Sequence, residues 1–493
     1  MKKLSIIAIA ATFLFANCTK DISNTLNVDP KSPSSGTSAG LFTDGELALT
    51  NTYTTTSISV APFRVISQEW AENTYVFEAN YNFADYNSPG GFWQALYVNA
   101  IHNLDLAKQQ FPATWSGSNA GLRASMDITD LLEIYGYYML MGTYGNIPYS
   151  QAENTKIPFP VFDDAATVYA DLLTRVDTCI VGLSGNDGTA MGAADQIYGG
   201  DPVAWLKFAA SLKLKMAMLN AAHDPTTAAK KVNEAIGTGV FTSNSDNALF
   251  AYDAASPTNS SPLWQALYYS GRNDFGPAAL LVNTMVGWND PRLPDYFMLD
   301  GNGNYTGGNA GDPSNSYGGY SDFCCTSPKL TNIYSPTLQG DLLDYAQVEF
   351  YKAEAAAQGF ITGGAELYYD SAITASVTFW GGAASDAATY LAQPSVAYTS
   401  ALATDGSWQQ VIGYQEWIAN YNHNWDSWTD IRRLGQPNIN VVSPPIDANG
   451  QLFPLRYYYP PNETTSNPTN TKAAVAALPG GIDNTQAKLF WEP

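Results

Sequence analysis

Apolar residues recur along most of the chain at the spacing of amphipathic helices. Between Tyr169 and Ile180 they occupy positions 169, 172, 173, 176 and 180, which form one stripe. The pattern predicts helices over 41–57, 62–73, 92–110, 120–142, 164–183, 203–222, 226–237, 276–287, 342–358, 365–379 and 409–421. Strand-like alternation is sparse. We therefore expect a mainly α fold, with antiparallel helix pairs joined by short loops.

Two stretches break this pattern. Thr242–Gln339 is poor in helical periodicity and rich in Pro, Gly and Asn, and Tyr75–Gly91 is a shorter stretch of the same kind. Long irregular segments inside a compact domain are uncommon and often functional. The tail after Asn440 is also rich in Pro and Asn, and it lacks a helical pattern.

The first residues have the pattern of an export signal. A basic start at Met1–Lys3 precedes the apolar run Leu4–Ala16, which is too short to span a bilayer but fits a signal-peptide core. The run ends in Leu-Phe-Ala-Asn-Cys, which resembles a bacterial lipobox. We expect a signal peptide over 1–17, a lipid on Cys18, a flexible tether over 18–40 and a folded body over 41–493. An ordinary signal peptide cut elsewhere is the alternative.

Composition narrows the range of ligands. Charged residues make up 14% of the chain and aromatic residues 13%, and 23 basic against 45 acidic side chains give a net charge of −22. Nucleic-acid binding through a general basic surface is excluded, because phosphate contacts need clustered Lys and Arg. Attraction to anionic lipid or polyanionic substrates is disfavoured. Such a composition suits neutral polar ligands.

Metal and thiol chemistry receive little support from the sequence. We expect no metal site, because the histidines lie far apart without ligand spacing: His102, His223 and His423. The turn at Asp300–Asn304 resembles the first half of a calcium loop but lacks its later Gly and Glu, so we interpret it as a plain turn; calcium binding elsewhere stays open. Cys179 fits a buried helical position. The adjacent Cys324 and Cys325 are either a vicinal disulfide or two free thiols.

Several sequence blocks, in this order and spacing, resemble the SusD/RagB family of nutrient-binding outer-membrane lipoproteins, and within it the SusD-like subgroup. The blocks are Leu26–Pro30, Gly142–Ala152, Gly200–Lys213, Asp290–Leu293, Phe350–Gly359, Gln415–Ala419 and Trp428–Pro437. In Gly142–Ala152, Thr143, Asn146 and Gln151 replace acidic residues that are usual in the family. We interpret the blocks as scaffold, and we expect a helix to end near Tyr144 with Gly145 as its breaker. Core positions are expected for Trp205, Trp417 and Trp428, and acidic or carbonyl partners for Arg432 and Arg433.

The resemblance implies a single large α-helical domain with tetratricopeptide-like helix pairs and long ligand-binding loops. It also implies a cell-surface lipoprotein of the outer membrane. Such a protein captures glycan or peptide and passes it to a SusC-like TonB-dependent transporter. No cofactor and no catalytic residue are implied.

Capture of a neutral oligosaccharide or polysaccharide is the leading hypothesis. Aromatic rings stack on the C–H face of a sugar, and polar groups hydrogen-bond its hydroxyls. The candidate ligand-binding residues are the rings of the two irregular stretches: Tyr75, Phe77, Tyr81, Phe83, Tyr86, Trp264, Tyr268, Tyr269, Trp288, Tyr305, Tyr317 and Tyr320. Candidate hydroxyl partners are Asn73, Asn80, Asn82 and Asp85.

Two alternatives remain. Peptide capture in the same kind of uptake system is the first. A glycoside hydrolase is the second, and it needs two positioned carboxylates. Acid pairs such as Asp163 with Asp164, or Asp426 with Asp430, lack a supporting motif, and no G-x-S-x-G motif occurs. We therefore expect a binding protein and not an enzyme.

Overall fold

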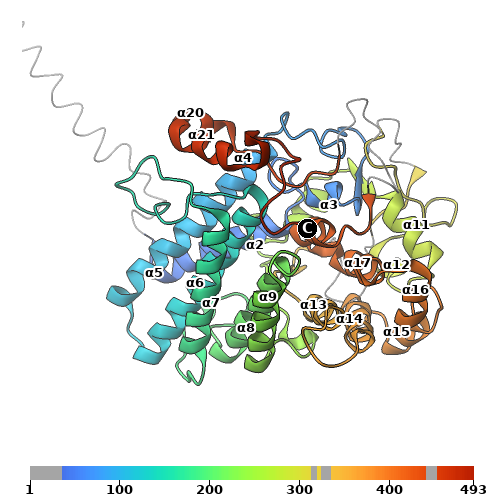
Figure 1. The fold of residues 1–493 in the computed structure, drawn as a ribbon, viewed down its shortest axis with the longest axis horizontal. Coiled ribbons are helices and arrows are strands. Elements are labelled where there is room, and N and C mark those ends of the chain that lie inside the picture. Colours follow the sequence, from blue (N-terminus) through green and yellow to red (C-terminus); the bar gives the residue numbers. More distant parts are fainter. Residues whose placement is uncertain (1–35, 313–318, 324–334, 440–451) are drawn as a thin grey trace, which may run out of the picture.

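The computed structural model describes residues 36–312, 319–323, 335–439 and 452–493. These residues are mainly helical, as predicted (Figure 1). The elements up to β2 are α2 (Ser38–Thr54), α3 (Phe63–Ile66), β1 (Trp70–Glu72), α4 (Ser88–Gln94), the π-helix η2 (Ala95–Ile101), α5 (His102–Thr114), α6 (Asn119–Tyr144), α7 (Ala165–Leu183), η3 (Gly192–Ala194), α8 (Pro202–Leu219), α9 (Pro225–Thr238), η4 (Asn244–Asp246) and β2 (Leu249–Phe250).

The elements after β2 include the irregular stretch and the C-terminal helices. They are η5 (Pro257–Asn259), α10 (Pro262–Trp264), the π-helix η6 (Gln265–Tyr269), β3 (Phe275–Pro277), α11 (Ala279–Gly287), α12 (Leu293–Tyr296), β4 (Gly340–Asp341), α13 (Tyr345–Ala357), α14 (Ala365–Trp380), α15 (Ala384–Leu391), α16 (Tyr398–Asp405), α17 (Trp408–Ala419), η8 (Asn420–Asn422), α18 (Asn424–Leu434), α20 (Pro461–Ser466), α21 (Pro468–Ala477) and η9 (Pro479–Gly481).

Helices that follow one another in the sequence also pack together. The series α5, α6, α7, α8 and α9 is contiguous, and α13 packs on both α14 and α17 (Figure 1). Short connections between amphipathic helices favour this arrangement, because each helix buries its apolar stripe against its neighbour. Within the described ranges, strands occur only as two short antiparallel ladders, β1 with β3 and β2 with β4.

Local chemistry explains where the longest helix begins and ends. The Ser118 hydroxyl caps α6 by accepting a hydrogen bond from the Gly121 amide at 3.0 Å. The helix ends at Tyr144, where Gly145 adopts a φ of 86°, a value that glycine tolerates without steric cost. The predicted helix break in the Gly142–Ala152 block is therefore confirmed.

The predicted helix over 62–73 is wrong in its second half. Only α3 is helical there. Gln68 then has a φ of 55°, and β1 follows at Trp70. The pairing of β1 with β3 overrides the local periodicity, because the partner strand lies some two hundred positions away in sequence and supplies the backbone hydrogen bonds.

The tail is also more helical than its sequence predicts. Two short helices, α20 and α21, begin at Pro461 and Pro468. Proline suits the first turn of a helix because its missing N–H has no partner there. Both helices are too short to show a hydrophobic stripe, and Thr471 and Ala474 are the buried residues of α21.

The family blocks within the described residues form part of the scaffold, as expected, whereas Leu26–Pro30 lies outside those residues. Trp205, Trp417 and Trp428 are buried in the main core. Arg432 lies 3.5 Å above the Trp428 ring and donates to the carbonyls of Gly142 and Leu455. The expectation for Arg433 is likewise confirmed, because its guanidinium pairs with Glu354 and Asp430 at 2.8 Å.

The structure also tests the expectations for Cys179 and for the turn at Asp300. Cys179 is buried. Asp300 forms the plain turn that we expected: one carboxylate oxygen accepts from the amides of Asn302 and Asn304, and the other accepts from the Thr306 hydroxyl. Cys18, Cys324, Cys325 and Tyr317 lie outside the described residues. No helix in the described ranges is long and apolar enough to cross a membrane.

Candidate functional site

The β1–β3 ladder brings the two irregular stretches together. Glu72, the last residue of β1, lies opposite Phe275, the first residue of β3. Just beyond them the Asn73 amide donates to the Asp274 carbonyl at 2.8 Å. In an antiparallel pair the chain after one strand and the chain before its partner leave from the same end. The loop after β1 and the segment before β3 therefore start side by side.

The loop after β1 exposes three rings, which we call the loop rings: Tyr75, Phe77 and Tyr86. Their exposed fractions are 53%, 39% and 37%. The centroids of Phe77 and Tyr86 lie 6.2 Å apart. Beside them, the Asn82 amide donates to the Asp85 carboxylate at 3.1 Å. This edge of the loop offers ring faces together with polar groups.

The segment before β3 carries a second group, which we call the helix rings: the half-buried Trp264 and the exposed Tyr268 and Tyr269. Trp264 stacks on Tyr268 at 6.0 Å and on Tyr269 at 5.2 Å, with interplanar angles of 24° and 28°. The two tyrosines are 65% and 63% exposed. The neighbouring residues Leu263 and Leu267 are buried and hold α10 and η6 against the body. Clustered exposed rings are unusual on a soluble surface unless they meet a partner.

The prediction that Tyr81 and Phe83 present their rings to a ligand is wrong, because both rings are buried. Tyr81 is 3% exposed and meets the ring of Phe453, and Phe83 is 1% exposed and meets Tyr457. Both rings pack under the loop and attach it to the C-terminal segment. Their sequence context resembles that of the exposed rings, so composition alone did not separate them.

The other candidates are partly covered. Trp288 directly follows α11, and its ring packs against Tyr414 of α17 with the ring centroids 5.6 Å apart. Tyr305 and Tyr320 are half-buried. Among the residues expected to bind sugar hydroxyls, Asn73 is buried. The side-chain amide of Asn80 donates to the Gly311 carbonyl at 3.1 Å. The Asn80 contact joins the loop to the segment around residues 304–312.

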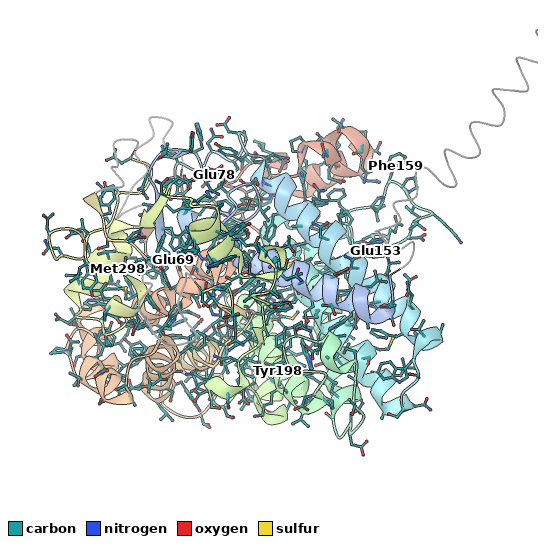
Figure 2. All side chains as sticks on the ribbon, turned by 180° about the vertical axis from the view of Figure 1, so that it is seen from behind. Glu69, Glu78, Glu153, Phe159, Tyr198 and Met298 are labelled. Atoms are coloured by element: carbon teal, nitrogen blue, oxygen red, sulfur yellow. The ribbon has the colours of Figure 1, made fainter. Side chains whose placement is uncertain are left out.

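A buried carboxylate pair lies behind the loop rings. Glu72 and Glu78 are 2% and 0% exposed, and the Ala79 amide donates to Glu72 at 3.0 Å. Burial, and after it the neighbouring Glu78, raises the pKa of Glu72 to about 9. Burial also raises the pKa of Glu78 to about 7. Figure 2 shows Glu78 nearer the upper margin of the molecule than Glu69. At neutral pH, Glu72 is therefore mainly protonated, and Glu78 is close to its midpoint of titration.

Basic charge is present near the rings but is neutralised. Arg272 pairs with Asp274 at 2.5 Å, and its guanidinium lies 4.6 Å from the centroid of Phe275. Asp274 is the main cause that raises the pKa of Arg272, and Tyr86 of the loop rings is near enough to contribute a minor effect. Tyr86 therefore lies in the neighbourhood of the segment that carries the helix rings.

The carboxylates of the hydrolase alternative have structural partners. Asp164 caps α7 through the Thr167 amide, and Asp163 accepts from the Tyr149 and Ser150 amides. Asp426 pairs with Lys215 at 2.5 Å. These contacts account for the acids without a catalytic role.

Sequence reasoning did not find two pockets near the Gly142–Ala152 block. One, of about 480 Å³, is lined by Lys108 and Arg175, which pair with Asp130 and Glu133. The other, of about 470 Å³, is lined by apolar residues that include Trp93, Tyr97, Pro148 and Pro160. Glu153, labelled in Figure 2, lines both. Their residues come from six helical elements and the loop after α6, so no local motif marks them.

Known proteins with this fold support the family resemblance. A family model described as "Starch-binding associating with outer membrane" matches residues 30–460. No curated protein matches the chain. Among solved structures, a chitin-binding SusD homolog from Flavobacterium johnsoniae has a TM-score of 0.76 and 21% identity, with 91% of this chain and 98% of that chain covered.

Two further structures agree. A SusD homolog from Bacteroides fragilis has a TM-score of 0.77 and 21% identity, covering 93% of this chain and 99% of that chain. A SusD-like protein from Bacteroides thetaiotaomicron has a TM-score of 0.73 and 23% identity, covering 92% and 98%. SusD-like proteins are non-catalytic nutrient-binding proteins of the outer membrane. This chain belongs to the SusD-like family.

Proposed function

We propose that this protein captures a neutral oligosaccharide or polysaccharide at the cell surface, on the loop rings and the helix rings. The observation that carries the proposal is the exposure of both ring groups beside one end of the β1–β3 ladder. Ring faces bind the C–H face of a pyranose, and the adjacent Asn and Asp groups suit its hydroxyls.

The charge of the chain supports a neutral ligand. The net charge is −22, and Arg272, the basic residue near the rings, is already paired with Asp274. A polyanionic glycan would be repelled by such a surface. Two of the solved relatives are described as chitin-binding, so oligomers of N-acetylglucosamine are the first ligands to test.

We further propose a lipid on Cys18 and delivery of the ligand to a SusC-like TonB-dependent transporter. The lipobox-like sequence supports the first point, and the family's association with the outer membrane supports the second. Replacement of Cys18 by Ser should release the protein from outer-membrane fractions. The transporter should co-purify with the tagged wild-type protein from those membranes.

Calorimetric titration tests the ligand. The panel contains neutral oligomers of chitin, starch, β-glucan, mannan and fructan, a uronic-acid oligomer and a peptide mixture. We expect one neutral glycan to bind and the uronic-acid oligomer not to bind. The double variant Tyr75→Ala/Phe77→Ala should weaken that binding and leave thermal stability unchanged. Binding of the peptides alone would favour the peptide-capture alternative. Unchanged glycan affinity in the folded variant would remove the loop rings from the site.

A further inference from the structure

We propose that Asp341, Asp344 and His423 form a buried binding site for one divalent transition-metal ion of the zinc type. Asp341 belongs to β4, Asp344 is the N-cap of α13, and His423 precedes α18. The three residues are 1%, 4% and 2% exposed. Their possible ligand atoms all lie within 4.8 Å of one another. The site therefore joins β4 and the starts of α13 and α18 in the protein interior.

The distances fit ligands that share an ion. His423 Nε2 lies 3.4 Å from Asp341 Oδ2 and 3.5 Å from Asp344 Oδ2. A charge-assisted hydrogen bond is shorter, at about 2.7–2.9 Å. In a tetrahedral zinc site with bonds of about 2.0–2.1 Å, neighbouring ligand atoms stand about 3.3 Å apart. The observed separations match this second geometry.

Asp341 supplies an independent observation. Neither of its carboxylate oxygens accepts a hydrogen bond, although the residue is almost fully buried. A buried carboxylate without a donor is costly, and a bound cation would satisfy it. Asp344 is better supplied, because its Oδ1 accepts from the Gln347 amide at 2.7 Å. Its Oδ2 is the atom that faces His423.

The far side of the imidazole is arranged as for a metal ligand. His423 Nδ1 lies 3.1 Å from the Tyr53 hydroxyl, and that hydroxyl donates its own proton to Asp426. The Tyr53 oxygen can therefore accept the Nδ1 proton, which leaves the Nε2 lone pair directed at the two carboxylates. Metal-ligating histidines commonly hold their second nitrogen in such an outer hydrogen bond.

The charges balance with a divalent ion. Asp426 is paired with Lys215 at 2.5 Å, so that ammonium is already neutralised. One ion of charge +2 neutralises Asp341 and Asp344, with a neutral His423 as third ligand. One nitrogen and two carboxylate ligands suit zinc, with water in the fourth position. Calcium prefers oxygen ligands throughout, so it fits less well.

Refolding in the presence of zinc tests the site. Because the ligands are buried, the ion is expected to enter during folding. The full chain is unfolded with a chelator, refolded with or without Zn²⁺, freed of excess ion and analysed for zinc by mass spectrometry. We expect one zinc per chain and a higher melting temperature with zinc. Asp341→Asn should lower zinc affinity at least tenfold, whereas Asp300→Asn, in the exposed turn, should not change it.

Alternative variants and measurements test the site if a protein does not refold. If Asp341→Asn does not refold, Asp344→Asn takes its place. If the wild type does not refold, zinc is measured in protein purified without unfolding from cells grown with added zinc. Cobalt in place of zinc should give the visible absorption of a tetrahedral site. Folded wild-type protein that holds no zinc would overturn the proposal, and it would leave His423 as an imidazolium between two carboxylates.

Discussion

The rings of Phe77 and Tyr86 lie 6.2 Å apart at the surface, while Tyr81 and Phe83, from the same loop, are buried beneath it. One short segment thus supplies both exposed rings and their anchors. The buried rings hold the loop on Phe453 and Tyr457, so the positions of the loop rings depend on the C-terminal segment.

The helix rings should carry much of the glycan affinity. Stacked aromatic contacts contribute about 0.5–1.5 kcal/mol each beyond the buried area. The variant Tyr268→Ala/Tyr269→Ala should therefore weaken binding about 5- to 150-fold, as measured by calorimetry. Phe159→Ala is the matched control, because Phe159 is 57% exposed but its backbone carbonyl accepts a hydrogen bond from Asn470 of α21, and Figure 2 shows it to the side of Glu78. Equal affinities of the two variants would contradict the assignment.

Truncation of an anchor ring should destabilise the protein. Phe83→Ala removes a buried ring and should lower the free energy of unfolding by about 3–5 kcal/mol. Its neighbour Tyr86 is 37% exposed, so Tyr86→Ala should change that energy by less than about 0.5 kcal/mol. Urea unfolding followed by tryptophan fluorescence measures both. A small effect of Phe83→Ala would mean that the loop is not anchored by this ring.

Two Arg–Asp ion pairs, each between residues two positions apart in the sequence, should contribute differently to the stability of the protein. Arg292 and Asp290 are fully buried and 2.6 Å apart, whereas Arg272 and Asp274 are 32% and 21% exposed at 2.5 Å. Arg292→Met leaves Asp290 buried without its cation and should cost about 3–5 kcal/mol. Arg272→Met should cost about 0–1 kcal/mol. The denaturant midpoints of the two variants measure these losses of stability. Equal shifts of the midpoint in both variants would contradict the prediction.

The carboxyl pair behind the loop rings should make stability depend on pH. Glu72 and Glu78 have pKa values of about 9 and 7 in the folded protein, raised by burial above the ordinary value of 4.5. Between pH 4.5 and these values the folded state holds protons that the unfolded chain has lost. The free energy of unfolding should therefore fall as pH rises through this range.

The variant Glu78→Gln tests this dependence. It keeps the shape of the side chain but has no proton to lose, and it also removes the charge that raises the pKa of Glu72. Melting temperatures of the wild type should fall between pH 5 and pH 9, and those of the variant should fall less. A variant with the same pH dependence as the wild type would rule out the pair as its source.

Much of the scaffold could be predicted from local patterns. The stripe between Tyr169 and Ile180 predicted α7, and the breaker Gly145 marked the end of α6. The helix α18 was not predicted, although its residues belong to a family block. Its buried face mixes Trp425, Trp428 and Ile431 with Asp426 and Asp430, which pair with basic partners, so the charged positions interrupt the apolar pattern.

The sequence by itself determined the helical class, the family and the two ring-rich stretches, because periodicity, ordered blocks and composition are properties of the chain. Only the tertiary structure decided which rings are exposed. Tyr81 and Phe83 are buried by partners some 370 positions away, whereas Tyr75 and Phe77 are not. It alone also placed His423 beside Asp341, because ligands from separate elements leave no spacing to read.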